Sequence, residues 1–94
     1  MNLLFVTKPT FTEVSEEAPQ TYVGIWKSAG GFVRHELLPD GRYVKQRGRR
    51  PAVSGRYQVE GERIAYESDE GRTYEGVFAN GALRQADMLF YKVN

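Results

Sequence analysis

The sequence predicts an all-β protein, a small eight-stranded antiparallel up-and-down barrel preceded by an N-terminal arm. After residue 20, short stretches of alternating apolar and polar residues follow one another, each ended by a turn signal, and none shows a helical period. The composition of six tyrosines, five phenylalanines and ten glycines favours strands joined by tight turns. The single tryptophan, Trp26, follows Gly24 near the start of the first alternating stretch. Eight strands joined by short turns can close into a barrel, which leaves no unpaired edge.

Length and composition limit the choice of function. A chain of 94 residues makes one domain, and without cysteine it has neither disulfides nor thiolate metal sites. The formal net charge of +1 gives no overall field that would attract nucleic acid. The apolar stretch at residues 3–6 is too short for a signal peptide or a membrane span. We therefore expect a cytoplasmic protein without a nucleic-acid or membrane partner.

The turn signals divide the chain into an arm and eight strands. Residues 1–20, with Pro9, Pro19 and several glutamates, are predicted to form an irregular arm or an edge strand, and residues 21–94 the barrel domain. The predicted strands are residues 21–28, 32–38, 42–47, 52–59, 63–67, 72–79, 82–85 and 87–93. The Pro39-Asp40-Gly41 sequence indicates one tight turn, and Asn80-Gly81 is typical of a two-residue hairpin.

Alternation predicts which side chains point into the barrel, because successive residues of a strand face opposite sides. The predicted inward residues are Tyr22, Gly24, Trp26, Val33, His35, Leu37, Tyr43, Val53, Gly55, Tyr57, Val59, Ile64, Tyr66, Tyr74, Gly76 and Phe78. The last strand is apolar on both faces, with Met88 and Phe90 on one and Leu89 and Tyr91 on the other. Either pair can be the inward one, and we expect the outer pair to be covered by the arm or by a second subunit.

Several of these residues occur together in a known family. The matching stretches are Gly24-Ile25-Trp26-Lys27-Ser28, Glu36-Leu37-Leu38-Pro39-Asp40-Gly41-Arg42-Tyr43 and Gly55-Arg56-Tyr57. Between residues 22 and 92 the chain resembles a family of small uncharacterised bacterial proteins first described from Agrobacterium. The resemblance implies a streptavidin-like barrel of the lipocalin-like group and carries no established activity. The chain differs from the family pattern at His35, at Tyr74, at Ser68 and at Gln85-Ala86-Asp87, so a ligand can differ too.

Two residues are assigned to closing one end of the barrel. In lipocalin-like barrels a basic residue of the last strand packs across the tryptophan of the first strand, and Lys92 lies at the corresponding position. A cation over an indole face contributes about 0.5–2 kcal/mol, depending on desolvation. We interpret Trp26 and Lys92 as a structural closure and not as ligand contacts.

The candidate ligand site consists of inward aromatic residues and two polar contacts. Its residues are Tyr43, Tyr57, Tyr66, Tyr74, His35 and Arg49. Four inward tyrosines would line a pocket with aromatic walls and hydroxyl tips, which suits a small hydrophobic or aromatic molecule. The alternative is that these large side chains simply fill the interior, since an eight-stranded barrel is just wide enough for that.

The remaining polar residues give little support for catalysis. His35 is the only histidine, so it can act as a proton shuttle, but without a second histidine or a cysteine no metal site or other cofactor is expected. No serine lies in a nucleophile-elbow sequence. The basic cluster is Arg42, Lys45, Arg47, Arg49, Arg50 and Arg56, and we interpret it as solvated charges on the outer wall and not as a nucleic-acid surface.

The sequence therefore leaves three hypotheses open. The leading one is a non-enzymatic barrel that binds a small molecule. The second is a small barrel enzyme, a cyclase or isomerase that acts on a hydrophobic substrate through His35 and the tyrosines. The third is a solid-core protein that forms a homodimer or larger assembly through the arm or the last strand.

Overall fold

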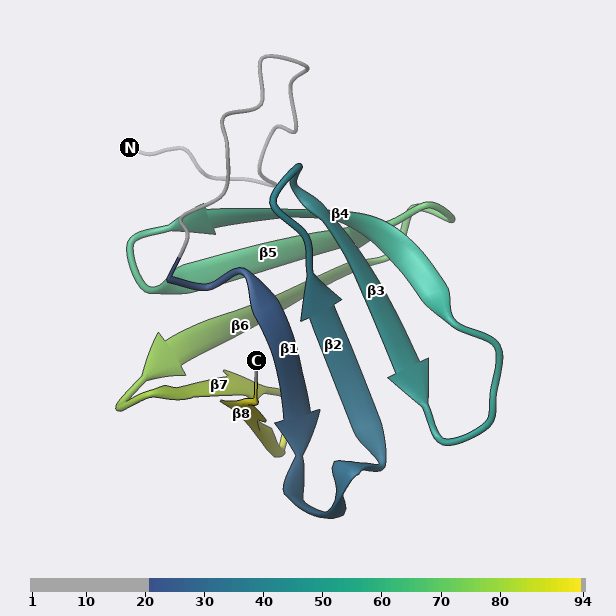
Figure 1. The fold of residues 1–94 in the computed structure, drawn as a ribbon. Coiled ribbons are helices and arrows are strands. Elements are labelled where there is room, and N and C mark those ends of the chain that lie inside the picture. Colours follow the sequence, from purple (N-terminus) through teal and green to yellow (C-terminus); the bar gives the residue numbers. More distant parts are fainter. Residues whose placement is uncertain (1–20, 94) are drawn as a thin grey trace.

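The computed structural model describes residues 21–93, which form a closed barrel of eight antiparallel strands in sequence order (Figure 1). The elements are β1 (Gly24–Ser28), the 3₁₀ turn η2 (Ala29–Gly31), β2 (Val33–Leu37), β3 (Arg42–Arg47), β4 (Val53–Glu60), β5 (Arg63–Ser68), β6 (Thr73–Ala79), β7 (Ala82–Gln85) and β8 (Met88–Lys92). The barrel closes where β1 pairs with β8, with Ser28 opposite Phe90. The predicted fold class is therefore confirmed. The predicted arm, residues 1–20, lies outside the described residues.

The strand boundaries follow the turn signals closely. The predicted bounds of β3 and β7 coincide with the observed ones, and the first predicted strand starts three residues before Gly24. The Asn80-Gly81 turn has φ values of 54° and 78°, the two positive values that a type I′ hairpin requires. The short turns explain why every strand pairs with its sequence neighbour.

The two ends of the barrel carry different turns. The end that we call the β2–β3 end carries the turns at residues 38–41, 61–62 and 80–81. The opposite end, the β3–β4 end, carries the turns at residues 29–32, 48–52, 69–72 and 86–87. The strands are staggered, so residues near opposite ends of different strands can lie at the same level, as Tyr43 of β3 and Ser68 of β5 do on either side of Gly55.

Large side chains point into the interior. The buried core consists of Trp26, Val33, Leu37, Tyr43, Tyr57, Ile64, Tyr66, Phe78, Leu83 and Phe90. Space for the Tyr43 ring depends on Gly55, which lies opposite it in the register of β3 and β4. A Cβ atom at Gly55 would lie 2.8 Å from Cε1 of Tyr43 and 2.7 Å from Cα of Ser68, closer than real Cβ contacts. Glycine at this position lets β5 and the Tyr43 ring approach β4.

The structure decides two points about the inward faces. In β8, Phe90 is buried and Met88 packs against the core, whereas Leu89 and Tyr91 are 44% and 50% exposed. The two-faced strand therefore points Met88 and Phe90 inward. Val53 shares the inward face of β4 with Gly55 and Tyr57 as predicted, but it begins the strand at the β3–β4 end and is 43% exposed.

Candidate functional site

Three neighbouring strands bring a group of polar aromatic side chains together inside the barrel. His35 of β2, Tyr43 of β3 and Tyr66 of β5 are each almost completely buried. The Nδ1 atom of His35 lies 3.3 Å from the Tyr66 hydroxyl, and the Tyr43 and Tyr66 rings meet edge to face with centroids 5.0 Å apart. On its other side the imidazole stacks on Phe90 at 4.3 Å. Tyr66 thus stands between the other two polar side chains.

Burial decides the protonation of this group. Desolvation, with a smaller contribution from the positive charge of Lys45, lowers the pKa of His35 to about 3, so the imidazole is neutral at pH 7. Burial also strongly raises the pKa of the Tyr66 hydroxyl, which keeps its proton. The Tyr66 hydroxyl keeps its proton, and Nδ1 of His35 is the acceptor found for it among residues 21–93. We therefore assign the hydroxyl as donor and Nδ1 as acceptor. The imidazole proton then resides on Nε2.

Two buried polar atoms of the group lack a hydrogen-bond partner. They are Nε2 of His35 and the hydroxyl of Tyr43, which have none among residues 21–93 although both residues are only 1% exposed. Burial raises the pKa of Tyr43 to about 12, so this hydroxyl also keeps its proton. An unsatisfied buried polar group costs about 1–3 kcal/mol. Such groups are rare in proteins, and they are expected where an additional molecule completes the hydrogen bonds.

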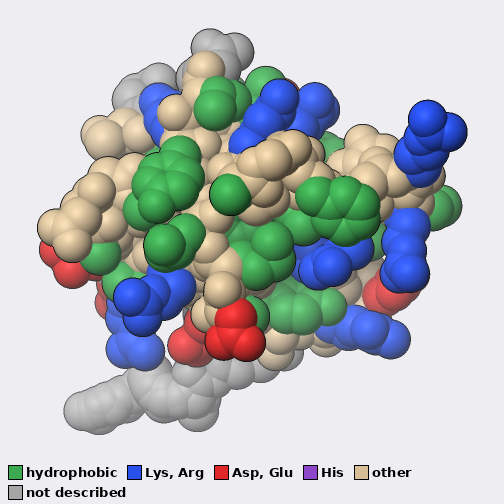
Figure 2. All heavy atoms as spheres, turned by 90° about the horizontal axis from the view of Figure 1, so that it is seen from below, with side chains coloured by type: hydrophobic (Ala, Val, Ile, Leu, Met, Phe, Trp, Pro, Cys, Tyr) green, Lys and Arg blue, Asp and Glu red, His purple; other side chains and the backbone are tan. Residues whose placement is uncertain are grey.

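A lysine reaches the same region from the β3–β4 end. The Nζ atom of Lys45 lies over the Tyr74 ring, 5.0 Å from its centroid. Lys45 belongs to β3 and Tyr74 to β6, and β4 and β5 separate these strands in the barrel. The lysine side chain therefore crosses from one wall to another. Figure 2, seen from the side on which the β1–β2 turn lies in Figure 1, shows hydrophobic side chains with Lys and Arg side chains among them.

The predicted site residues divide into those that meet and those that do not. His35, Tyr43 and Tyr66 meet inside the barrel, and Tyr74 packs against the core while remaining half-buried. The Tyr57 hydroxyl instead donates a hydrogen bond of 2.7 Å to the backbone carbonyl of Leu38. Arg49 is exposed on the turn between β3 and β4.

Trp26 belongs to a second aromatic group, nearer the β2–β3 end. Its ring lies 5.3 Å from that of Phe78, which in turn stacks on Tyr22 at 3.8 Å. The indole Nε1 donates a hydrogen bond of 3.0 Å to the Tyr22 carbonyl. Lys92 lies directly opposite Trp26 in the register of β1 and β8 and is exposed. The predicted closure of the barrel by Trp26 and Lys92 stays a prediction.

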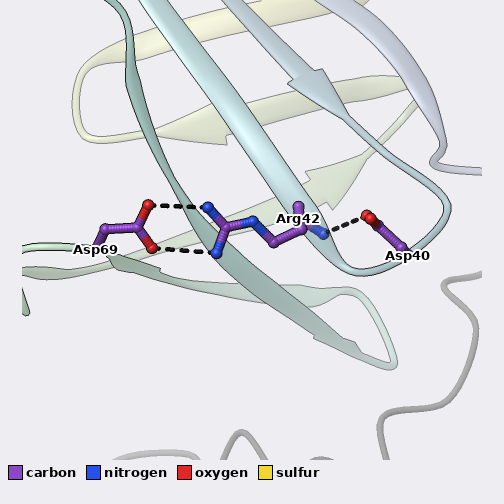
Figure 3. A network of polar contacts seen from close by, with 3 residues as sticks. All are labelled: Asp40, Arg42 and Asp69. Atoms are coloured by element: carbon purple, nitrogen blue, oxygen red, sulfur yellow. Dashed lines mark hydrogen bonds and ion pairs between the residues drawn. The ribbon is translucent and has the colours of Figure 1, made fainter.

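On the outer wall, Arg42 connects two turns (Figure 3). Its guanidinium donates two hydrogen bonds to the Asp69 carboxylate, of 3.1 Å and 2.8 Å. Its backbone N–H donates to the Asp40 carboxylate at 3.0 Å. The expectation that Arg42 is a charge of the outer wall is confirmed, and the pair has no part in the interior site.

Comparison with known proteins agrees with this architecture. The model of a family described as Agrobacterium tumefaciens protein Atu4866 matches residues 19–92, which include all eight strands. The chain belongs to this family. The solution structure of the protein Atu4866 from Agrobacterium tumefaciens is similar, with a TM-score of 0.67 and 44% sequence identity over 78% of this chain and 95% of that one. The predicted membership of an Agrobacterium-derived family is thereby confirmed.

The comparisons add no activity to the family membership. No curated protein matches the chain. Among residues 21–93, no group of three or more His, Asp or Glu side chains lies close enough together to hold a metal ion. Within the same residues, no helix is long and apolar enough to cross a membrane. The functional argument therefore depends on the interior group.

Sequence analysis missed Lys45 as a site residue. It was assigned to the outer wall as one of six basic residues of β3, β4 and their turn, but its side chain shares the inward face with Tyr43. The signal was present in the alternation, because Lys45 follows Tyr43 by two residues and pairs with His35 in the register. A lysine at an inward position of a small barrel is therefore a candidate site residue in the same way as an inward aromatic residue.

Proposed function

We propose that this barrel binds a small, partly polar aromatic or apolar molecule among His35, Tyr43, Tyr66 and Tyr74. The observation that carries the proposal is the pair of buried polar atoms without a partner, Nε2 of His35 and the Tyr43 hydroxyl. A ligand with a hydrogen-bonding group could satisfy both atoms, while its body would contact the aromatic rings. The resemblance to streptavidin-like and lipocalin-like barrels is part of this proposal, since barrels of that kind hold one small ligand.

The protonation of His35 favours binding over proton transfer. General bases are most effective when their pKa lies near the working pH, and burial lowers the pKa of His35 to about 3. Its Nδ1 atom is also engaged with the Tyr66 hydroxyl. A neutral imidazole in this setting serves better as a fixed hydrogen-bond donor than as a cyclase or isomerase base.

The test is a binding screen with neutral aromatic amides and alcohols of one and two rings, followed by NMR of the protein. We expect binders to shift the signals of the His35 ring and of Tyr43. Tyr43→Phe should weaken binding about fivefold, because it removes one hydrogen bond to the ligand. Tyr57→Phe is the matched control, since that hydroxyl already donates to Leu38, and it should leave affinity unchanged. Binding that shifts the signals of neither His35 nor Tyr43, or a screen without any binder, would overturn the proposal.

A second proposed function is self-association through the outer face of β8. The exposed apolar residues Leu89 and Tyr91 lie there. Val77 of β6, also exposed, pairs with Arg84 of β7, and Arg84 pairs with Leu89 of β8. Leu89 and Tyr91 form an exposed apolar pair that a second copy of the chain could cover, and Arg84 separates this pair from Val77. Sedimentation equilibrium should then show a dimer that Leu89→Lys dissociates and Val53→Lys, a control at another exposed apolar residue, does not. A wild-type monomer at every concentration would exclude it.

A further inference from the structure

We infer that the ligand of this barrel carries an anionic head group, a carboxylate, which Lys45 receives at the β3–β4 end. The inference rests on the proposed function and adds the chemical class of the ligand.

The acidic residues of the strands all lie at outward positions, whereas basic residues lie on both faces. Alternation places Lys45 at an inward position, in line with Tyr43 and half-buried, whereas Arg47 and Lys92 share the inward faces of β3 and β8 but are exposed at the strand ends. No Asp or Glu occupies an inward position in β1 to β8, because the acidic strand residues alternate with the buried ones. A half-buried positive charge with no acidic residue on its face of the wall favours a ligand of the opposite sign.

The contact of Lys45 with the Tyr74 ring can be replaced by a contact with a ligand. Its ammonium lies over the Tyr74 ring, and among residues 21–93 no carboxylate lies within ion-pair distance of it. A cation over a phenol ring is held less strongly than a cation hydrogen-bonded to a carboxylate. A carboxylate that enters at the β3–β4 end would therefore draw the ammonium away from the ring. Tyr74 would then be free to pack against the body of the ligand.

The two unpartnered atoms fit the same head group. In the assigned tautomer Nε2 of His35 is a donor, and the protonated Tyr43 hydroxyl is a donor as well. A carboxylate only accepts hydrogen bonds, so it is matched to a set of three donors that includes Lys45. An amine or a guanidine would bring further donors and a second positive charge. The donor set therefore selects an acid with an apolar or aromatic body.

The test compares matched acid and amide probes. 2-Naphthoate and 2-naphthamide have the same ring system and differ in charge, and benzoate and benzamide form a smaller pair. We expect the wild-type protein to bind the acid of a pair about tenfold more tightly than the amide in titrations at low salt. Added NaCl should reduce that preference, because the half-buried Lys45 is accessible to counterions.

Variants separate the role of Lys45 from general charge. Lys45→Met keeps the apolar stem and should abolish the preference while amide binding persists, and Lys45→Arg should retain it. Arg34→Met removes the same charge from the outward face of β2 and should retain the preference as well. Equal binding of acid and amide by the wild-type protein, or a preference that survives Lys45→Met, would overturn the inference and leave the proposed function standing. If neither acid nor amide of either pair binds, the proposed function falls with it.

Discussion

The two aromatic groups inside the barrel differ in how their polar atoms are satisfied. The indole nitrogen of Trp26 donates to the Tyr22 carbonyl, and the hydroxyl of Tyr57, which lies opposite Tyr66 in the register of β4 and β5, donates to the Leu38 carbonyl. Around His35, the imidazole Nε2 and the Tyr43 hydroxyl have no partner among residues 21–93. Both groups consist mainly of buried aromatic side chains. They differ in whether the fold itself completes the hydrogen bonds.

This difference indicates which part of the interior maintains the fold and which part is available for function. A buried polar group with a hydrogen-bond partner adds to stability, whereas one without a partner lowers it. Selection for stability alone would replace such an unpartnered group. Natural sequences break such rules mainly at functional sites. The group around Trp26 is therefore interpreted as structural and the group around His35 as the binding region. Four measurements test that division, in order of decreasing expected effect.

Gly55→Ala should cause the largest loss of stability. The added Cβ would meet the Glu67 carbonyl, Cα of Ser68 and the Tyr43 ring, two of which are backbone and cannot move aside cheaply. We expect the free energy of unfolding in urea to fall by about 3 kcal/mol. Ser54→Ala, on the outward face of the same strand, is the control and should change it little. A stable Gly55→Ala variant would show that the Tyr43 ring is not held in place by β4.

The pH dependence of stability should identify His35 as a buried neutral group. Its pKa is near 6.5 in the unfolded chain and about 3 in the folded protein, so between these values the unfolded state binds more protons. Stability is therefore complete above pH 6.5 and falls by about 1.4 kcal/mol per pH unit as the pH decreases towards 3. His35→Leu should remove this contribution. Equal slopes for the wild type and His35→Leu between pH 6 and pH 4 would contradict the assignment.

Two Tyr→Phe substitutions compare a hydroxyl that has a partner with one that has none. Tyr57→Phe removes a hydroxyl that donates to the Leu38 carbonyl and should lower the free energy of unfolding by about 1 kcal/mol. Tyr43→Phe removes a hydroxyl without a partner and should leave stability unchanged or increase it. Chemical denaturation of both variants provides the measurement. If Tyr43→Phe proved the more costly substitution, its hydroxyl would be satisfied and the division between the two groups would fail.

The strands and turns were predictable from the sequence because their signals are local. Asn80-Gly81 needs no tertiary contact to favour a hairpin, and alternation in β2 predicted the burial of His35 and Leu37. The orientation of β8 was not predictable, because both of its faces are apolar. Only the packing of Phe90 into the core decides between them.

The site was predictable in part. The buried tyrosines and His35 follow from alternation. Arg49 was predicted as the cation of the site, but the structure places Lys45 nearest the interior, and charge alone does not distinguish the two. Arg49 lies in a turn, where side-chain direction has no period, whereas Lys45 lies in a strand with a fixed direction. Which hydroxyls are satisfied depends on backbone carbonyls brought near by folding, such as that of Leu38 beside Tyr57. Such information is absent from a sequence pattern.

Asp69→Asn should have the smallest effect, because it acts on the outer wall and touches neither aromatic group. The hydrogen bonds from the Arg42 guanidinium lower the pKa of Asp69, so their contribution is present at neutral pH and is lost as the pH falls through the lowered pKa. The pair is exposed to solvent, which screens it. We expect a slight decrease in the urea midpoint at pH 7 that disappears in acid and in high salt. A large decrease at pH 7 would mean that the turn at residues 69–72 contributes as much to the free energy of unfolding as Gly55 does.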